Sequence, residues 1–422
     1  HKKAALEHVK NLVYKGMEKT LYALEFFQQL LQEYCEAVID GSGNEVRSLL
    51  ANSSVNNSNP CEHAIHLLST RAGVRAVCEL VAYGTAKDRK SILKSLKGYA
   101  KSGLLHPQAY LVYLQLIQLT DDTVLVHKQM LQELLTVAKD DDKAEGDDPT
   151  SPLLELALSE RAVKLFMMVL LLNDKNNGSD SKESKNESKT STMSLSKLLD
   201  PYELSVLTPG KVPTVTEADG TAVPTSKKEA SLKQKELFKY LQKPLLDLCT
   251  QHTTELLMSR SGSMLLRQVY LSLGEAAPQA VQAMLEQVII ACEAPLSNED
   301  GDNDGADEQK QSQEYELLGD TVGHWSIKNL LLADLGRAEG DDDTPSFSNA
   351  FLEAFGPKLT KVALSHGNRS AFVVAALAQV QPVKKLLDVK ELQKHVRKKS
   401  EGNGGAGKSN AGLTALLKQL DA

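Results

Sequence analysis

The stretch HLLSTRAGVRAVCELVAYGTAKDRKSILKSLKGY (66–99) decides the fold class of this chain. After Gly73 its apolar residues recur at spacings of three and four, which is the period of an amphipathic α-helix. Thr85 and Asp88 then have the spacing of a capping box, in which two side chains satisfy backbone N–H groups at a helix start. The stretch therefore predicts two successive helices with a short turn between them.

The same helical period continues through most of the sequence. It runs over 5–39 and over 107–138, where the residues at 121–123 break the pattern into two helices. The run 159–172 is apolar almost all round and is therefore expected in the core. Convincing alternating strands are absent, so the fold is predicted to be all-α, with further helices at 229–258, 262–273, 276–293, 322–335, 347–365, 367–380, 383–399 and 411–420.

Several of these helices begin with a similar phrase, which consists of a short polar run, a glycine and then apolar residues. The phrases are STRAGVRAVCELV (69–81), SRSGSMLLRQVYL (259–271), DTVGHWSIKNLLL (320–332) and SHGNRSAFVVAAL (365–377), at irregular spacing. Glycine at the start of a helix allows the close approach of a neighbouring segment. Short helices of this kind, joined by extendable loops, predict an α-solenoid in which each unit packs mainly on its neighbours.

Acidic and basic residues are distributed unevenly along the sequence. Lys and Arg total 48 against 55 Asp and Glu, which as an average argues against a nucleic-acid binder. The acidic residues, however, gather in 139–148, 297–309 and 338–343, which we expect to be disordered loops. The Ser/Lys/Asn tract 173–194 and the Pro/Thr/Gly-rich segment 205–226 are expected to be loops as well, so the helices that remain are near neutral or basic.

Other features of the composition narrow the class of protein. The five cysteines are scattered without a C-x-x-C pair, which is typical of reduced thiols in an intracellular protein. No run of about 18 apolar residues indicates a membrane span. Residue 1 is His rather than Met and the first segment is already helical in pattern, so the chain is expected to begin inside a larger architecture.

The helix-entry phrases resemble the second helix of Pumilio repeats, which are three-helix units stacked into an armadillo-type solenoid. The segment from Gly84 to Lys90, Gly-x-x-Lys-Asp-Arg-Lys, resembles the divergent nucleolar Pumilio-like class called Puf-A. Three further stretches resemble segments of the same class and follow one another in the same order. They are LTDDTVLVHKQMLQEL (119–134), SKKEASLKQKEL (226–237) and VGHWSIKNLL (322–331). The resemblance covers nearly the whole chain.

This resemblance implies a four-part organisation. Residues 1–172 would be Pumilio-like repeats from an array truncated at its N-terminus, and 173–226 a mostly disordered insert with a short helix. Residues 227–400 would be the helical region known in that class as CPL, followed by a Gly-rich linker and a last helix at 401–422.

The resemblance also implies a function. It implies a scaffold, not an enzyme and without cofactors, that binds structured pre-ribosomal RNA in the nucleus and nucleolus. Its expected role is ribosome biogenesis, with translational regulation as a second role and pre-60S assembly factors as further partners. A HEAT/armadillo-like adaptor that binds proteins through apolar entry positions such as Val74 and Phe372 is the alternative.

In ordinary Pumilio repeats, three side chains of each repeat contact one base, and they are the first, second and fifth residues after the entry glycine. Here these positions lack the paired hydrogen-bonding groups that discriminate base edges, so we predict RNA binding without a base code. Arg75, Tyr110, Trp325 and Arg369 are the candidates for stacking on a base, although packing between helices is the commoner role of a lone Trp. The triplets are Val74, Arg75 and Cys78; Ser263, Met264 and Arg267; His324, Trp325 and Lys328; Asn368, Arg369 and Phe372; and, without an entry glycine, Ala109, Tyr110 and Tyr113, and Val163, Lys164 and Met167.

Lysines provide the candidate for a contact with the RNA backbone. At spacings of three and four they share one face of a predicted helix, where ammonium groups can follow phosphates without reading bases. The alternative is a solvated face that only keeps the helix soluble. The predicted backbone-binding residues are Lys87, Arg89, Lys90, Lys94, Lys97 and Lys101, and two further basic clusters comprise Lys384, Lys385, Lys390, Lys394, Arg397, Lys398 and Lys399, and Lys227, Lys228, Lys233, Lys235, Lys239 and Lys243.

Two motifs suggest other chemistry, and we predict neither. EGNGGAGKSN (401–410) fits the phosphate-binding pattern G-x-x-x-x-G-K-[ST], but a charged helix precedes it where a buried strand is needed. CEHAIH (61–66) brings together Cys61, His63 and His66, but neither a fourth ligand nor a suitable geometry for zinc is indicated. No metal site is therefore expected.

Overall fold

The computed structural model describes residues 2–39, 43–55, 58–135, 152–171, 194–293, 317–336, 344–364, 369–402 and 411–421. The acidic runs 139–148, 297–309 and 338–343, and the tract 173–194 except its last residue, lie outside the described residues. The chain forms two compact units, the first comprising residues 1–177 and 193–241 and the second residues 242–422 with 178–192. The four-part division expected from the resemblance stays a prediction.

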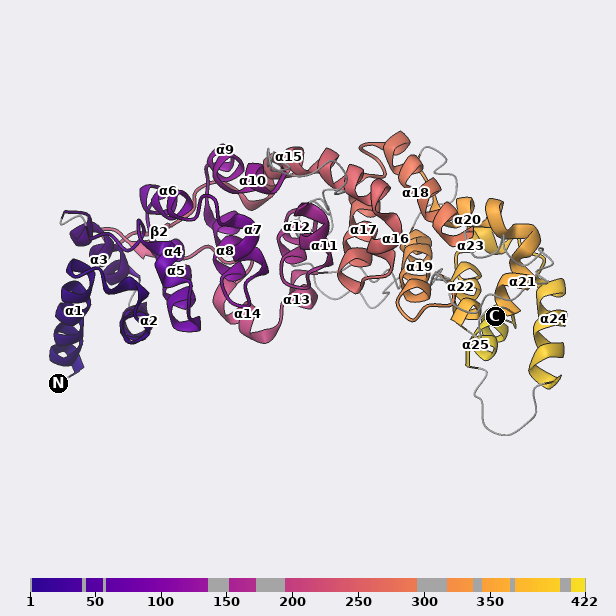
Figure 1. The fold of residues 1–422 in the computed structure, drawn as a ribbon, viewed down its shortest axis with the longest axis horizontal. Coiled ribbons are helices and arrows are strands. Elements are labelled where there is room, and N and C mark those ends of the chain that lie inside the picture. The colour runs from indigo at the N-terminus through magenta and orange to yellow at the C-terminus, as the bar shows by residue number, and fades with distance from the viewer. Residues whose placement is uncertain are drawn as a thin grey trace, which may run out of the picture. The chain divides into compact units, whose positions relative to one another are not determined.

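The first unit is built almost entirely from short helices (Figure 1). Its elements are α1 (Lys2–Glu18), η1 (Leu21–Ala23), α2 (Glu25–Ile39), α3 (Asn44–Val55), α4 (Ala64–Leu67), α5 (Arg71–Tyr83), α6 (Ala86–Ser95), α7 (Ala100–Leu105), α8 (Tyr110–Leu119), α9 (Thr123–Val126), the π-helix η2 (His127–Leu131), α10 (Gln132–Leu135), α11 (Pro152–Leu158), α12 (Val163–Leu171), α13 (Leu195–Leu198), α14 (Pro201–Leu207), the antiparallel strands β1 (Thr214–Thr216) and β2 (Ala222–Pro224), and α15 (Ala230–Gln251), which extends past the unit boundary.

The second unit, as far as it is described, contains helices only. They are α16 (Thr253–Leu257), α17 (Arg260–Leu273), α18 (Pro278–Glu293), α19 (Gly323–Leu331), η3 (Leu332–Gly336), α20 (Phe347–Phe355), η4 (Gly356–Lys358), α21 (Leu359–Leu364), α22 (Arg369–Leu377), α23 (Gln381–Lys384), α24 (Val389–Gly402) and α25 (Ala411–Asp421). None of the helices described in either unit has both the length and the hydropathy that crossing a bilayer requires.

Equivalent helices of successive repeats stack on one another. In the first unit α2 packs on α5 and α5 on α8, and in the second unit α17 packs on α19, α19 on α22 and α22 on α25. Their buried faces are made of aliphatic side chains, as in α5, where Val74, Val77, Leu80 and Val81 are fully buried. Each unit is thus a stack of helical repeats, and the predicted all-α solenoid fold is confirmed.

The entry glycines explain why the phrases recur. A Cβ on Gly73 would lie 1.9 Å from the carbonyl oxygen of Leu67, one on Gly262 would lie 2.7 Å from that of Leu256, and one on Gly323 would lie 2.3 Å from that of Leu317. Each partner is the sixth residue before its glycine, so the same close approach is built three times. The fourth phrase has its glycine at 367, outside the described residues.

The C-terminal end of α5 shows how the stretch 66–99 specifies its fold. The last four carbonyls of a helix have no partner inside it. Here Gly84 N–H donates to the oxygen of Leu80, the Arg89 guanidinium donates to the oxygens of Val81 (2.8 Å) and Ala82 (3.3 Å), and Arg47 Nε donates to that of Tyr83 (3.2 Å). All four are therefore satisfied, three of them by two arginines whose charge also suits the negative end of the helix dipole.

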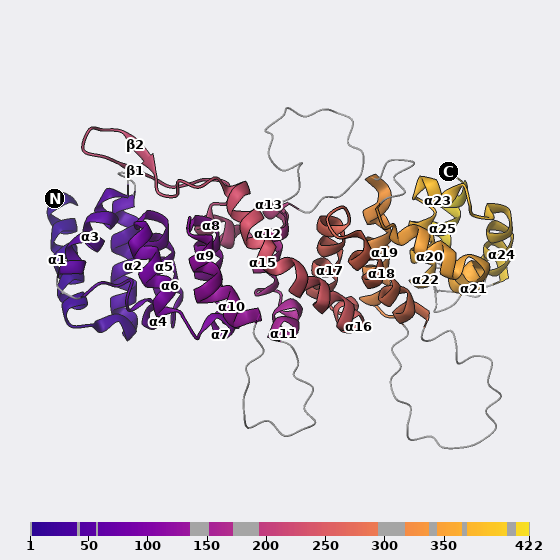
Figure 2. The ribbon, with the colours of Figure 1, turned by 90° about the horizontal axis from the view of Figure 1, so that it is seen from above.

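The segment 213–228, which we call the return segment, is the largest departure from the sequence-based expectation. Residues 205–226, which include most of it, were expected to be a loop, but the hairpin β1–β2 forms within it, and it passes back along helices that lie far earlier in the sequence (Figure 2). The Asn44 side-chain amide exchanges two hydrogen bonds with the backbone of Thr216 (2.7 and 2.9 Å), and Arg89 Nη1 donates to the oxygen of Thr225 (2.8 Å). These side chains satisfy backbone groups that a polar loop would leave to water.

Candidate nucleic-acid interface

Helix α6 presents the predicted lysines to solvent. Its start is fixed by the predicted capping box, in which Asp88 Oδ2 accepts from Thr85 N–H (2.8 Å) and Thr85 Oγ1 accepts from Asp88 N–H (3.3 Å). Ile92 and Leu93 are buried on one side, while Lys87, Lys90 and Lys94 are exposed on the other. The capping box and these three exposed lysines agree with the prediction.

The predicted row of lysines does not continue along a single helix as far as Lys101, so the prediction of one continuous helix face is wrong. Helix α6 ends at Ser95, and Gly98 adopts a positive φ of 86°, which reverses the chain before α7 begins. Lys97 is exposed in this turn, beside the last turn of α6. Lys101 lies on α7 and forms an ion pair with Glu155 (2.6 Å), so it is not part of the free row. Tyr99, in the same turn, is 51% exposed.

Arg89 is also incorrectly predicted as a contact with RNA. It is only 1% exposed, and all three guanidinium nitrogens donate to backbone carbonyls. Burial lowers the pKa of Arg89 to about 10, which still leaves the side chain protonated at neutral pH. Its role is to join α5 to the return segment.

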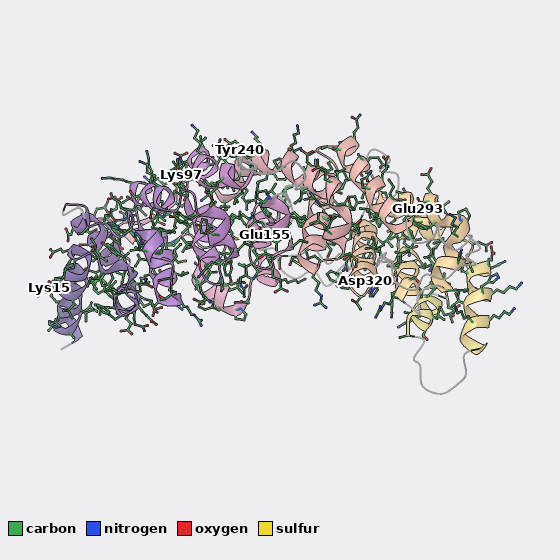
Figure 3. The ribbon with its side chains drawn as sticks, in the orientation of Figure 1. Lys15, Lys97, Glu155, Tyr240, Glu293 and Asp320 are labelled. Atoms are coloured by element: carbon green, nitrogen blue, oxygen red, sulfur yellow. The ribbon has the colours of Figure 1, made fainter. Side chains whose placement is uncertain are left out.

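Two neighbouring elements extend the lysine row. The π-helix η2 packs against α6 and exposes Lys128, and α15 exposes Lys235 and Lys239. These elements lie along the upper edge of the first unit in Figure 1, and Lys97 and Tyr240 lie along the same edge in Figure 3. We call the set Lys87, Lys90, Lys94, Lys97, Lys128, Lys235 and Lys239 the lysine ridge; within the described residues, none of its members forms an ion pair.

An aromatic pair lies beside the ridge. The His127 ring stacks on Tyr240 with 3.8 Å between centroids and 16° between planes, which joins η2 to α15. Burial, with a smaller effect of Lys128, lowers the pKa of His127, so its ring is neutral at physiological pH. Pairs of this kind offer a flat surface on which a base can stack. The sequence has no signal for it, because the partners are far apart and π-helices have no simple residue pattern.

Acidic side chains near the ridge are held by other partners. Glu133 accepts hydrogen bonds from the backbone N–H groups of Gly98 and Ala100, both at 2.9 Å. Glu236 accepts from Thr123 and forms an ion pair with Lys228 (2.5 Å). The ridge therefore keeps its positive character despite the net charge of −7 of the chain.

The four candidates for base stacking are placed very differently. Tyr110 is 5% exposed and its hydroxyl donates to Glu203 (2.5 Å), so this prediction is wrong. Arg75 is half-buried, with its Nε 2.6 Å from Glu36 Oε1. Arg369 is exposed and donates to the oxygen of Gly319 (2.7 Å), and Trp325 is 39% exposed, more than the packing role favoured for a lone Trp requires. Trp325 therefore remains a candidate.

Most side chains at the positions that would contact a base are buried or bonded within the protein. The first and fifth positions after Gly73 are fully buried Val74 and nearly buried Cys78, and Ser263 after Gly262 is 5% exposed. Arg267 donates to the oxygen of Asn329 (3.1 Å), while Asn368 lies outside the described residues. These positions serve the packing of helix on helix.

Several members of the other basic clusters bind groups within the protein. In the second unit, Arg397 pairs with Asp421 (2.9 Å), Lys399 donates to the oxygen of Leu364 and Lys384 to that of Gln419. In the first unit, Lys233 is 2% exposed and donates to Ser226 Oγ and to the oxygen of Gln118, both at 2.7 Å. Burial lowers the pKa of Lys233.

The two motifs with other possible chemistry can be located only in part. Residues 403–410 of the glycine-rich segment lie outside the described residues, and the elements on either side of it are helices α24 and α25. The ring of His63 stacks on Tyr22 at 4.7 Å, and Cys61 is fully buried, which raises its pKa. In the described part of the chain, no group of three or more His, Cys, Asp or Glu side chains is arranged to hold a metal ion.

Comparisons with known proteins agree with this architecture. Residues 188–342 match the CPL (NUC119) domain family. Pumilio homolog 3 of Mus musculus is 24% identical over 361 residues, which is 86% of this chain and 46% of that protein. The crystal structures of human Puf-A alone and of human Puf-A in complex with DNA are similar with TM-scores of 0.67 and 0.64 and identities of 17% and 18%, covering 98% of this chain and 65% of each of those chains.

The fold defines a helical-repeat protein, and residues 188–342 within it match the CPL family. The likeness to the solved structures concerns the fold alone, and the chain spans less than half the length of the curated relatives it matches first. Together the CPL match, the relatives and the fold make the chain similar to divergent Puf-A-like members of the Pumilio family.

Proposed function

We propose that this chain is an RNA-binding scaffold that contacts structured RNA through its phosphates at the lysine ridge. The observation that carries the proposal is the set of seven exposed ridge lysines without an ion pair among the described residues. Ammonium groups on rigid helices exchange condensed counterions of the nucleic acid for protein contacts, which gives affinity without sequence preference.

The closed base-code positions support the same mode of binding. Without exposed pairs of donors and acceptors, the stacked helices have no means of reading Watson–Crick edges one repeat at a time. The human Puf-A structure in complex with DNA supports nucleic acid as the class of partner. We further propose, from the family resemblance, a non-enzymatic role in ribosome biogenesis on pre-ribosomal RNA in the nucleus and nucleolus, alongside pre-60S assembly factors, with translational regulation as a second role.

The test is charge reversal on α6. The variant Lys87→Glu, Lys90→Glu, Lys94→Glu and a matched control, Lys15→Glu, Lys19→Glu, Lys197→Glu, change the net charge equally, and the control residues are exposed elsewhere in the first unit. Affinity for a fluorescent RNA hairpin is measured by anisotropy at several salt concentrations. Each lost phosphate contact is expected to reduce the slope of log affinity against log salt by about 1, so the slope of the first variant falls by about 3.

The control must retain the slope of the unmodified protein. Equal slopes for the two variants would show that net charge, rather than the ridge, determines binding. A protein-binding adaptor is the alternative function, and fully buried Val74 lends it no support. Partners that remain bound after RNase treatment, together with an unchanged salt slope, would favour the adaptor.

A further inference from the structure

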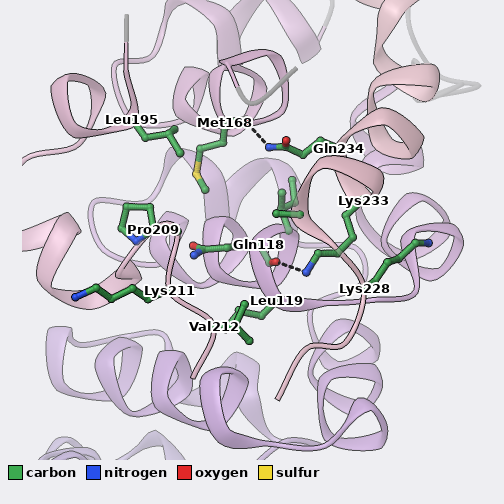
Figure 4. Close-up of a pocket in the computed structure, with 13 residues that line it drawn as sticks. Gln118, Leu119, Met168, Leu195, Pro209, Lys211, Val212, Lys228, Lys233 and Gln234 are labelled. Carbon is green, nitrogen blue, oxygen red and sulfur yellow. Dashed lines mark hydrogen bonds between the residues drawn. The ribbon is translucent and has the colours of Figure 1, made fainter. Parts of the chain in front are cut away.

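A small cavity lies in the first unit between α8, α12, α13, the loop after α14 and the start of α15 (Figure 4). Its volume is about 100 Å³. Most of its wall is apolar, contributed by Ile117, Leu119, Met168, Leu195, Pro209 and Val212. An apolar cavity of about 150 Å³ accommodates a benzene ring, so this smaller cavity admits at most a single six-membered ring.

Two glutamine side chains give the cavity a polar part. Gln234 is 6% exposed, and its Nε2 donates to the oxygen of Met168 (3.1 Å), which fixes Oε1 as an acceptor. This Oε1 and the Oε1 of Gln118 are both buried and without a hydrogen-bond partner. Figure 4 shows the Gln118 amide pointing into the space near Pro209. Buried polar atoms without partners are rare in folded proteins, and here two of them line one cavity.

The cavity adjoins the lysine ridge. Lys228 lines it and also lines a shallow hollow that contains Lys239 and Tyr240 together with the acidic residues Asp121, Asp122 and Glu236. Lys211, also part of the cavity lining, is exposed and forms no ion pair with the described residues. A nucleotide whose base entered the cavity would therefore have a free ammonium group nearby for its phosphate.

We propose that this cavity binds one unstacked pyrimidine base of a bound RNA, with cytosine preferred over uracil. Gln118 offers an acceptor and a donor that match the N4 amino group and N3 of cytosine, in the bidentate manner common between amides and bases. The amino group has a second N–H for Gln234 Oε1. Uracil carries an acceptor at that position, so it leaves the fixed Gln234 oxygen facing another oxygen.

This inference rests on the proposed RNA binding and adds to it a site for one unpaired base in a structured RNA. The experiment uses the full chain and four fluorescent RNA hairpins, which are fully paired or carry a single bulged cytosine, a bulged uracil or a bulged abasic nucleotide. We expect the cytosine bulge to bind about tenfold more tightly than the abasic bulge, with uracil between them, since each base-edge contact changes affinity by this order.

Gln118→Leu is expected to remove the difference between cytosine and abasic bulges while leaving binding of the paired hairpin unchanged. Val212→Trp narrows the cavity from a partly exposed position and gives the same result without removing a buried polar group. The matched control, Gln29→Leu, changes an exposed glutamine of α2 and retains the preference.

The outcomes separate the two proposals. If none of the hairpins binds at low salt, the proposed function fails and the cavity has no RNA to act on, which overturns this inference as well. If the paired hairpin binds with the expected salt slope but cytosine, uracil and abasic bulges bind equally, the ridge proposal survives and the cavity proposal is refuted. A preference that persists in both Gln118→Leu and Val212→Trp refutes it too.

Discussion

Replacing Arg89 tests how the stretch 66–99 is tied to the rest of the first unit. Arg89→Met preserves much of the side-chain volume but removes the guanidinium that donates to the oxygens of Val81, Ala82 and Thr225. The two bonds at 2.8 Å are charge-assisted and worth about 1.5–3 kcal/mol each. The substitution also removes the free-energy cost of burying the charged guanidinium, which offsets part of this loss. We therefore expect the free energy of unfolding of the first unit to fall by about 3 kcal/mol.

The location of the effect is as informative as its size. Hydrogen exchange followed by mass spectrometry is expected to show faster exchange in the return segment and at the end of α5, and little change at α1. Lys90→Met is the matched control, because it makes the same kind of substitution at the next residue, which is exposed. Arg89→Lys keeps the charge but not the planar fork, so it is expected to fall between the two.

The reasoning would be refuted by a different pattern of protection. If Arg89→Met destabilises the unit by less than about 0.5 kcal/mol, the range of ordinary surface substitutions, the buried guanidinium contributes little. If exchange rises evenly over all helices instead of at the return segment, Arg89 acts through general packing and not by fastening this segment.

Further predictions concern the entry glycines and a partly buried carboxyl group. Gly73→Ala is expected to lower the free energy of unfolding, measured with urea, by at least about 1–3 kcal/mol, because its Cβ would meet a backbone oxygen at 1.9 Å. The control Gly356→Ala, whose Cβ would have its nearest contact at 3.8 Å, is expected to change this free energy little. Equal losses of stability in the two variants would contradict the close-approach explanation. Burial raises the pKa of Glu79 to about 7, against the opposing charge of Arg75. The folded state therefore retains a proton that the unfolded state has already lost between about pH 4.5 and 7, so this residue makes stability fall as pH rises through that window. Glu79→Gln is expected to gain about 2–3 kcal/mol relative to the unmodified protein between pH 5 and pH 8, and a pH-independent difference would show that Glu79 titrates normally.

Local patterns in the sequence predicted the helices, the entry glycines and the capping box at Thr85, since each depends on residues within one or two turns. The burial of Arg89 also had a local signal that charge alone obscured, because Arg89 lies three and four residues before buried Ile92 and Leu93. The path of the return segment had no such signal, since its hydrogen bonds join residues 136 and 172 apart in the sequence. The cavity depends in the same way on side chains from several distant elements.

The return segment has a consequence for how the first unit unfolds. In a simple repeat array each unit contacts only its neighbours, and the ends can separate while the middle remains folded. Here one piece of chain is bonded to α3 through Asn44, to α6 through Arg89 and to the turn after α8 through Asp121, whose carboxylate accepts from Ser226 (2.6 Å) and from the N–H of Lys227 (2.8 Å). Unfolding of any one repeat therefore breaks hydrogen bonds that also hold the segment to the others. We expect these helices to unfold in a single cooperative transition rather than one after another.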